Sequence, residues 1–336
     1  MKSLAVFSKG TLIKSEPAAD PSTAFRVVVD KEVADHIRSW RLILLLALLV
    51  LTFLGALYVS MSNIRSAVSN MQDPDSTFLY LKLLTTTDGT MPPFHVFLNF
   101  LGPLLGIALG FDAINSEQNN GTLIRLMAQP VYRDNLILAK FVSALIIVGT
   151  LFFTLVLLMI GAGLSITGVW IEPAEVLRIF TFAVLAVVYV GFWLSLSILF
   201  SIAFKQTATS ALAAIGVWLF FTVFYQIVVN LVIGALIPKQ TILSETDLVG
   251  YNEMVLNILR LAPSQLFSDA TTTLLMPSVR SLGPMTMEQM AGAIPAPLPF
   301  TESLMVVWPQ LSGLLAATFL CFAYSYYLFM RREIRS

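Results

Sequence analysis

Long apolar stretches, with charged residues only toward their ends, alternate with polar segments along most of this chain. A membrane core about 30 Å thick is crossed by a helix of about 20 apolar residues. Buried helices of a soluble protein would not explain so many stretches of that length. The pattern predicts an all-α integral membrane protein with six transmembrane helices, at residues 42–61, 94–114, 137–163, 177–204, 207–237 and 303–330.

An amphipathic pattern precedes the first predicted span. Apolar residues recur there at spacings of four, four and three, at Val29, Val33, Ile37 and Trp40. This spacing predicts a connecting helix over residues 25–40, which lies in the membrane interface. A plain cytoplasmic helix is the alternative.

The remaining polar segments complete the expected organisation. We predict a flexible cytoplasmic tail at 1–24, a six-span domain at 41–330 and a basic cytoplasmic tail at 331–336. Within the domain, residues 238–302 are too long for a simple connector, and we expect them to form a small helical region outside the membrane. The helix signals in this region are the stretch 253–261, Pro263 at a helix start, and a capping-box pattern over 286–289.

Composition and charge agree with a membrane protein and suggest its orientation. The chain is 57% hydrophobic and 12% charged, where a soluble domain carries about a quarter charged residues. Most of its 20 lysines and arginines fall in segments that share one side of the membrane. Because positive charge is retained in the cytoplasm, we predict that both termini are cytoplasmic.

Signs of catalytic chemistry are missing from the sequence. It contains no zinc-protease helix, nucleophile elbow or phosphate-binding loop, and its two histidines, His36 and His95, are predicted on opposite sides of the membrane. The span centres carry no charged residue, which argues against a proton or sodium relay. One cysteine, Cys321, excludes an intrachain disulfide. We therefore predict no catalytic, cofactor or metal site, and no binding of nucleic acid; energy for transport would come from a partner.

The segment between the second and third predicted spans has the most specific pattern. We expect a short helix that opens at Gly121–Thr122, breaks at Pro130 and restarts at the third span. A glutamate, three residues, Gly-Thr-Leu, and then Leu, Pro, Arg and Lys occur here as Glu117, Gly121, Thr122, Leu123, Leu126, Pro130, Arg133 and Lys140. This pattern resembles the permease family of type-2 ATP-binding-cassette (ABC-2) transporters. The residues Lys31, Glu32, Asp35 and Arg38 likewise look like that family's connecting helix.

The resemblance implies a function for this segment. In that family two permease subunits pair around a pathway, and the loop from Glu117 to Arg133 seats in a separate ATPase subunit that binds ATP and magnesium. We therefore expect a permease subunit of an exporter in the cell membrane of a prokaryote, forming a homodimer. Arg133 and Lys140 are equally interpretable as coupling residues or as anchors for lipid headgroups.

Three glycines on the second predicted span form a smooth face. They are Gly102, Gly106 and Gly110, and their spacing permits close helix contact. We expect ordinary packing within the bundle; a contact for gating or between subunits is the alternative.

Two other functions remain open at this point. The first is a membrane subunit that transmits ATP-driven movement to an outside protein without transporting anything. The second is an enzyme at the outer surface, with Glu253, Asp269 or Glu288 as its acidic groups. The substrate, which could be a drug, peptide, lipid or glycan, is not indicated by the sequence.

Overall fold

The computed structural model describes residues 21–68, 78–87, 89–127, 132–236, 245–278 and 297–331. This part of the chain is helical, with no strand, and confirms the predicted all-α class. Six of its helices or runs of helices are long and apolar enough to cross a membrane, as predicted. These spans are Trp40–Ser62, Phe94–Asn119, Arg133–Ser165, Pro173–Ala203, Thr207–Ala235 and Phe300–Arg331.

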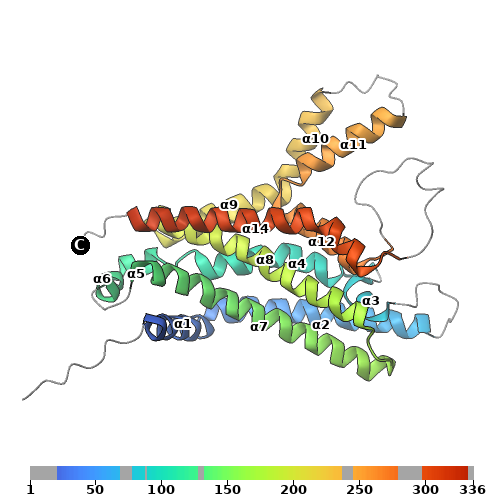
Figure 1. Cartoon of the computed structure of the whole chain (residues 1–336), viewed down its shortest axis with the longest axis horizontal. Coiled ribbons are helices and arrows are strands. Elements are labelled where there is room, and N and C mark those ends of the chain that lie inside the picture. Colours follow the sequence, from blue (N-terminus) through green and yellow to red (C-terminus); the bar gives the residue numbers. More distant parts are fainter. Residues whose placement is uncertain are drawn as a thin grey trace, which may run out of the picture.

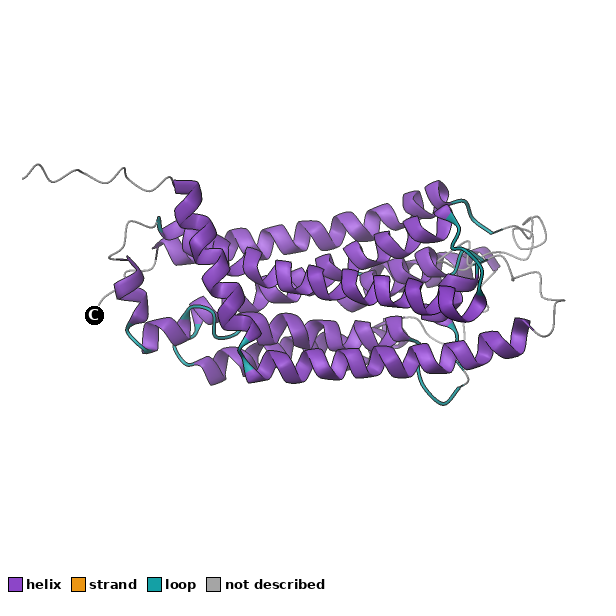
Figure 2. Ribbon diagram, turned by 90° about the horizontal axis from the view of Figure 1, so that it is seen from below, coloured by secondary structure: helices purple, strands orange, loops and turns teal. Residues whose placement is uncertain are grey.

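The long helices lie roughly along one axis and form an elongated bundle (Figures 1 and 2). The elements are α1 (Pro21–Ile37), α2 (Trp40–Val68), α3 (Leu79–Thr85), α4 (Phe94–Gly110), α5 (Asn115–Asn119), α6 (Thr122–Met127), α7 (Arg133–Thr167), α8 (Pro173–Ala203), α9 (Thr207–Leu219), the π-helical turn η2 (Phe220–Phe224), α10 (Tyr225–Leu236), α11 (Glu245–Leu259), α12 (Pro263–Leu275) and α14 (Phe300–Arg331).

Helix α8 is the centre of the bundle. Of the residues in its most apolar stretch, 72% are buried, the largest share of any span, because α4, α7, α12 and α14 all pack against it. The side chains of Tyr189 and Trp193 are fully buried, and Tyr189 stacks on Phe267 of α12 with ring centres 4.3 Å apart. The other spans are thus arranged around α8.

The glycine face of α4 lies directly against α8 of the same chain. A Cβ atom on Gly106 would lie 2.7 Å from the Val190 carbonyl oxygen, and one on Gly110 would lie 2.9 Å from that of Leu194. At Gly102 the nearest atoms, in Tyr189 and Val190, would be 3.4 Å away. The first two distances are too short for a side chain, so the backbones approach this closely only because the residues are glycines.

The fifth span leaves the bundle. Helix α9 runs beside α8, but α10 diverges from it after η2 and forms a hairpin with α11 (Figure 1). The Tyr225 hydroxyl of α10 donates to the Ile258 carbonyl of α11 at 2.7 Å. Only 17% of the most apolar stretch of this span is buried. A π-helical turn is a common cause of such a change in helix direction.

At the end of the bundle that carries α3 and α12, polar contacts hold short elements in place. The Glu175 carboxylate accepts the Tyr80 backbone N–H at 2.9 Å and so fixes the start of α3, in which Tyr80 and three leucines are buried. Arg178, 1% exposed, donates to the carbonyls of Leu274 and Leu298. These two residues of α8 therefore fasten α3 and α12 to the bundle.

Some predicted boundaries differ from the structure. Helix α1 begins at Pro21, within the predicted tail, because proline is well suited to a first helical turn, and it ends at Ile37. Trp40 instead starts α2. Val29 is buried against the rest of the chain, whereas Ile37 and Trp40 are exposed; that the helix lies in the membrane interface stays a prediction. Residues 1–20 lie outside the described residues.

In the segment between the fifth and sixth spans, two helices occur where helix signals were found. Helix α11 is longer than predicted, and Pro263 occupies the first turn of α12 as expected. Asp269 accepts hydrogen bonds from Arg260 and Gln265, which is a structural arrangement. Glu253 is exposed. The capping-box pattern over 286–289, with Glu288, lies outside the described residues.

Candidate functional site

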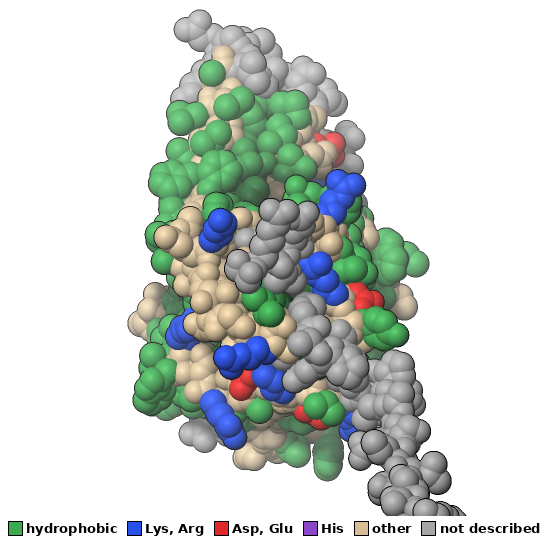
Figure 3. Space-filling view, turned by 90° about the vertical axis from the view of Figure 1, so that its left-hand side faces the viewer, with side chains coloured by type: hydrophobic (Ala, Val, Ile, Leu, Met, Phe, Trp, Pro, Cys, Tyr) green, Lys and Arg blue, Asp and Glu red, His purple; other side chains and the backbone are tan. Residues whose placement is uncertain are grey.

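One end of the bundle, which carries α1, α5, α6 and the end of α14, is rich in positive charge; we call it the basic end. Figure 3 looks onto this end and shows lysine and arginine side chains across it, with fewer acidic ones. Exposed tryptophan and tyrosine side chains, typical of membrane interfaces, occur near both ends of the spans. Examples are Trp40 and Tyr132 near the basic end, and Trp170 and Trp308 near the other.

The loop pattern found in the sequence forms a tight helix–turn–helix at the basic end. Gly121 lies between α5 and α6 with a φ of 69°, a conformation that glycine adopts without strain. The Thr122 hydroxyl then donates to the Glu117 carbonyl at 3.1 Å. This geometry explains why glycine and threonine are adjacent here, and it places α6 at the outermost point of the loop (Figure 1).

The residues of this turn differ in their exposure. Gly121, Thr122 and Arg125 are exposed, and the Ile124 side chain is 46% exposed. Leu123 is only 3% exposed and belongs to the hydrophobic core, so its side chain contacts other residues of this chain and is not exposed to a partner. Leu126 lies in α6, and Pro130 is outside the described residues. The surface that a soluble partner can reach therefore consists of Gly121, Thr122, Ile124 and Arg125, of which the sequence pattern singled out the first two.

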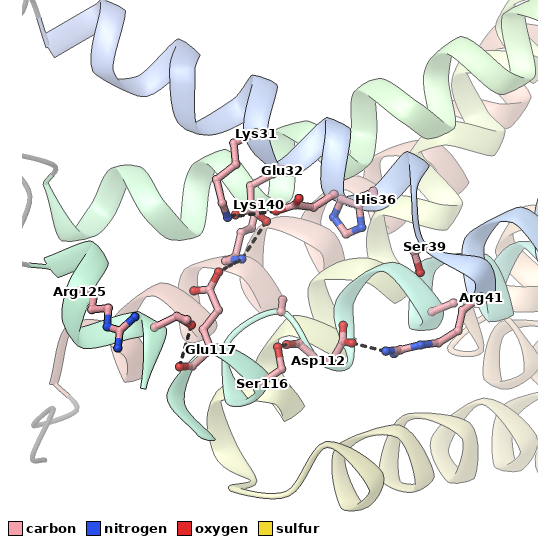
Figure 4. Close-up of a pocket in the computed structure, with 14 residues that line it drawn as sticks. Lys31, Glu32, His36, Ser39, Arg41, Asp112, Ser116, Glu117, Arg125 and Lys140 are labelled. Atoms are coloured by element: carbon pink, nitrogen blue, oxygen red, sulfur yellow. Dashed lines mark hydrogen bonds and ion pairs between the residues drawn. The ribbon is translucent and has the colours of Figure 1, made fainter. Parts of the chain in front are cut away.

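Below the turn, Lys140 of α7 bridges two helices that are distant in sequence. Its ammonium nitrogen lies 2.8 Å from Glu32 Oε2 of α1 and 2.8 Å from Glu117 Oε1 of α5 (Figure 4). The side chains of Lys140 and Glu32 are each 6% exposed and that of Glu117 is 13% exposed. Lys140 is thus a buried bridge between the predicted connecting helix and the loop, and the lipid-anchor alternative does not describe its contacts.

The ion pairs continue along α1. Lys31 contacts Glu32 Oε1 at 2.9 Å and Asp35 Oδ2 at 3.2 Å. Burial raises the pKa of the Glu32 carboxyl, but the charges and hydrogen bonds of Lys140 and Lys31 outweigh this effect and leave the pKa below its ordinary value. Glu32 is therefore ionised in the folded chain at neutral pH. Arg38, the fourth predicted residue of this helix, is exposed and lies outside this chain of ion pairs.

A cavity of about 550 Å³ lies between α1 and the loop. Its lining includes Lys31, Glu32 and Asp35 on one side and Glu117, Thr122 and Arg125 on another (Figure 4). On a further wall the Arg41 guanidinium binds Asp112 at 2.7 Å. Burial lowers the pKa of His36, which also lines the cavity, so this imidazole is neutral at neutral pH.

Further polar contacts connect the loop to three other parts of the bundle. The Ser201 hydroxyl, near the end of α8, accepts the backbone N–H groups of Ile114 and Asn115 at 2.9 and 3.2 Å. The side-chain amide of Asn119 donates to the backbone carbonyl of Lys205, in the turn before α9, at 3.0 Å. Arg133 donates to the Phe329 carbonyl near the end of α14 at 3.0 Å. A displacement of the loop would therefore act on α1, α7, α8, α9 and α14 together.

The family can now be identified. The model of the family described as "ABC-2 family transporter protein" matches residues 26–334, nearly the whole chain. This chain belongs to the ABC-2 transporter family. Together with its six apolar helices, this makes it a multi-pass protein of a prokaryotic cell membrane.

Two curated relatives of this chain are both named "Probable ABC transporter permease protein NosY". One, from Stutzerimonas stutzeri, is 26% identical over 148 residues, which cover 43% of this chain and 52% of the relative. The other, from Pseudomonas aeruginosa, is 27% identical over 176 residues, or 49% and 62% of the two chains. The matched part thus spans less than two thirds of the length of either relative.

The structure brings several of the predicted loop and connecting-helix residues of this ABC-2 family member into one place. Lys31, Glu32, Asp35, Glu117 and Thr122 all line the cavity. Two contacts were missed, those of Arg41 with Asp112 and of Ser201 with the start of α5. The sequence distances in these contacts, 71 and 87 residues, leave no local pattern from which they could be found.

Proposed function

We propose that this chain is the permease subunit of an ABC exporter and that the turn from α5 to α6 is where a separate ATPase subunit docks. ATP and magnesium would be bound by that ATPase, and this chain would itself have no catalytic site. The observation that carries the proposal is the bridge of Lys140 to Glu32 and Glu117. Through buried charges, this bridge joins the exposed turn to α1 and α7 at the basic end.

The bridge supports a mechanical role because its geometry is difficult to break. Separating Glu117 from Lys140 leaves a buried carboxylate without its ion-pair partner, which costs about 3 to 5 kcal/mol. A force on α6 is therefore more easily transmitted to α1 and α7 than absorbed at the bridge. The contacts of Ser201 and Arg133 pass the same movement to α8 and α14. The basic end would then face the cytoplasm, in agreement with its positive charge.

We further propose that two copies pair through the fifth span. Helix α10 projects from the bundle with most of its surface exposed (Figure 1). Gln226 and Asn230, four residues apart and so on one face of α10, are both exposed although they lie within a predicted membrane span. Amide side chains in apolar surroundings are stabilised by partners on a neighbouring helix, and a second copy offers the same amides.

Docking of the ATPase is tested by placing a charge on the exposed turn. We expect Ile124→Asp to abolish co-purification of the ATPase subunit with the full-length permease and to remove ATP-dependent transport in vesicles. Leu261→Asp, at a more accessible apolar residue near the other end (71% exposed), is the control and should retain both. Unchanged association in Ile124→Asp would rule out docking at this turn.

The reconstituted complex also separates transport from the alternative of a membrane subunit that only transmits movement. We expect ATP-dependent accumulation of an amphipathic cargo inside inverted vesicles, because the span centres carry no charge. Hydrolysis of ATP that changes the exposure of α10 and α11 to protease, with no movement of any cargo tested, would favour the alternative.

A further inference from the structure

The chain of ion pairs at the basic end is short of one positive charge. Contacts run without interruption through Asp35, Lys31, Glu32, Lys140 and Glu117. Three carboxylates are thus paired with two ammonium groups, which leaves this series of ion pairs with a net charge of −1. The other acidic wall residue, Asp112, has its own cation in Arg41. Arg125 also lines the cavity, so the lining as a whole is balanced, but Arg125 is exposed and makes no ion pair with these carboxylates among the described residues.

Glu117 is the end of the series and uses only one of its oxygens. Its Oε1 atom binds Lys140 at 2.8 Å, whereas its Oε2 atom is buried and has no hydrogen-bond donor among the described residues. A buried acceptor that carries part of a negative charge is costly without a donor. A second cationic donor that reaches Oε2 would remove this cost.

The cavity next to Glu117 opens at the surface proposed for docking. Thr122 and Arg125, exposed residues of α6, line the same cavity as Glu117 (Figure 4). Its volume, about 550 Å³, falls within the range of pockets that hold small molecules and is ample for a single side chain. A cationic group of a partner that covers α6 would enter the cavity beside Glu117, whose buried Oε2 atom has to turn toward the cavity to bind it.

We propose that this cavity receives one lysine or arginine side chain of the ATPase subunit, which binds Glu117 Oε2. The proposal rests on the proposed function, because it assumes that the ATPase covers α6. It assigns a chemistry to the contact, namely a charge-assisted hydrogen bond in a partly buried site, which is stronger than a neutral one. Docking would then neutralise the series of ion pairs that begins at Asp35.

A double-mutant cycle tests this pairing in the intact complex. Glu117→Gln in the full-length permease, held in nanodiscs, is combined with alanine substitutions of single lysines and arginines on the ATPase surface, and the dissociation constant is measured for each pair. We expect Glu117→Gln to weaken association about 10- to 100-fold. One ATPase substitution should weaken it to the same extent and have little further effect when Glu117→Gln is present.

Two controls address folding and charge in general. Asp30→Asn removes an exposed carboxylate of α1 at the same end and should leave association within about twofold of the wild type. Glu117→Asp keeps the carboxylate, so the ATPase substitution that is silent with Glu117→Gln should regain its effect in this background. A silent substitution in both backgrounds would mean that the carboxylate is not the partner and would overturn the proposal.

The remaining outcomes distinguish this proposal from the function on which it rests. If Ile124→Asp abolishes association but no ATPase cation is coupled to Glu117, docking stands and the proposed pairing is overturned. If Arg125→Gln in the permease weakens association, and this effect disappears when Glu117→Gln is present, the missing cation comes from this chain. The proposed pairing is then again overturned. If Ile124→Asp leaves association intact, the docking site itself is wrong.

Discussion

Replacing Lys140 by methionine tests whether the buried bridge joins α1 to the loop. Methionine has a similar length and apolar stem but cannot neutralise the two carboxylates that lie 2.8 Å from the ammonium. Glu32 keeps Lys31 as a partner, whereas Glu117 loses its only ion pair among the described residues. Because one buried carboxylate is left unpaired, we expect a loss of about 3 to 5 kcal/mol of stability.

The effect is measured by reversible denaturation of the purified protein in detergent, followed by protease sensitivity of α1. The matched control is Lys205→Met, since Lys205 is exposed at the same end and its replacement should change stability by less than about 0.5 kcal/mol. A triple variant in which Glu32→Gln and Glu117→Gln accompany Lys140→Met should recover most of the loss, because neutral groups replace the whole set of charges.

Two results would refute this account of the bridge. A loss below about 1 kcal/mol in Lys140→Met would mean that the carboxylates reach solvent or other donors without difficulty. An equal loss in Lys140→Met and in the triple variant would mean that packing of the lysine stem, and not charge, fixes α1 at this place.

Three further predictions concern other contacts of the fold. Gly106→Ala should destabilise the protein by about 1 to 3 kcal/mol, because its Cβ would lie 2.7 Å from a carbonyl of α8, whereas Gly149→Ala, with open space around it, should be neutral or stabilising in the same denaturation assay. Ser201→Ala should speed hydrogen exchange of the backbone amides of Ile114 and Asn115, which donate hydrogen bonds to the Ser201 hydroxyl. Unchanged exchange would show that these amides are protected without the hydroxyl. The pKa of Glu32 is lowered from its ordinary value of 4.5, so its ionised form stabilises the fold above pH 4.5, and this stability is lost as the pH falls through the folded-state pKa. Glu32→Gln should therefore lose less stability than the wild type between pH 7 and pH 3. An identical acid profile of the two proteins would contradict the assignment.

The spans were predictable because one physical requirement, about 20 apolar residues in a helix, determines their length. The observed first span, Trp40–Ser62, differs from the predicted 42–61 by two residues at one end and one at the other. The helix start at Pro263 was predictable for a similar reason, since proline restricts the chain locally. Features that depend on a residue and its immediate neighbours were therefore accessible from the sequence.

The role of Lys140 was not predictable in this way. A lysine near the end of an apolar span has the same local pattern whether it contacts lipid headgroups or a buried carboxylate. The deciding partner, Glu32, lies 108 residues earlier in the chain. Leu123 shows the reverse situation, because it belongs to the loop motif but its side chain is in the core, whereas the neighbouring Ile124 has the exposed apolar side chain.

The order of Glu32, Glu117 and Lys140 along the chain has a consequence for biosynthesis. Both carboxylates are translated before the lysine, which follows Glu117 by 23 residues and Glu32 by 108. While only the first two spans have entered the membrane, α1 has no cation from α7 to hold it and the loop has no fixed position. Helix α1 can take its final place only after the third span has been inserted, so a chain arrested before that point would present Glu117 without its cation, and α1 without its bridge to the loop, to the quality-control proteases of the cell.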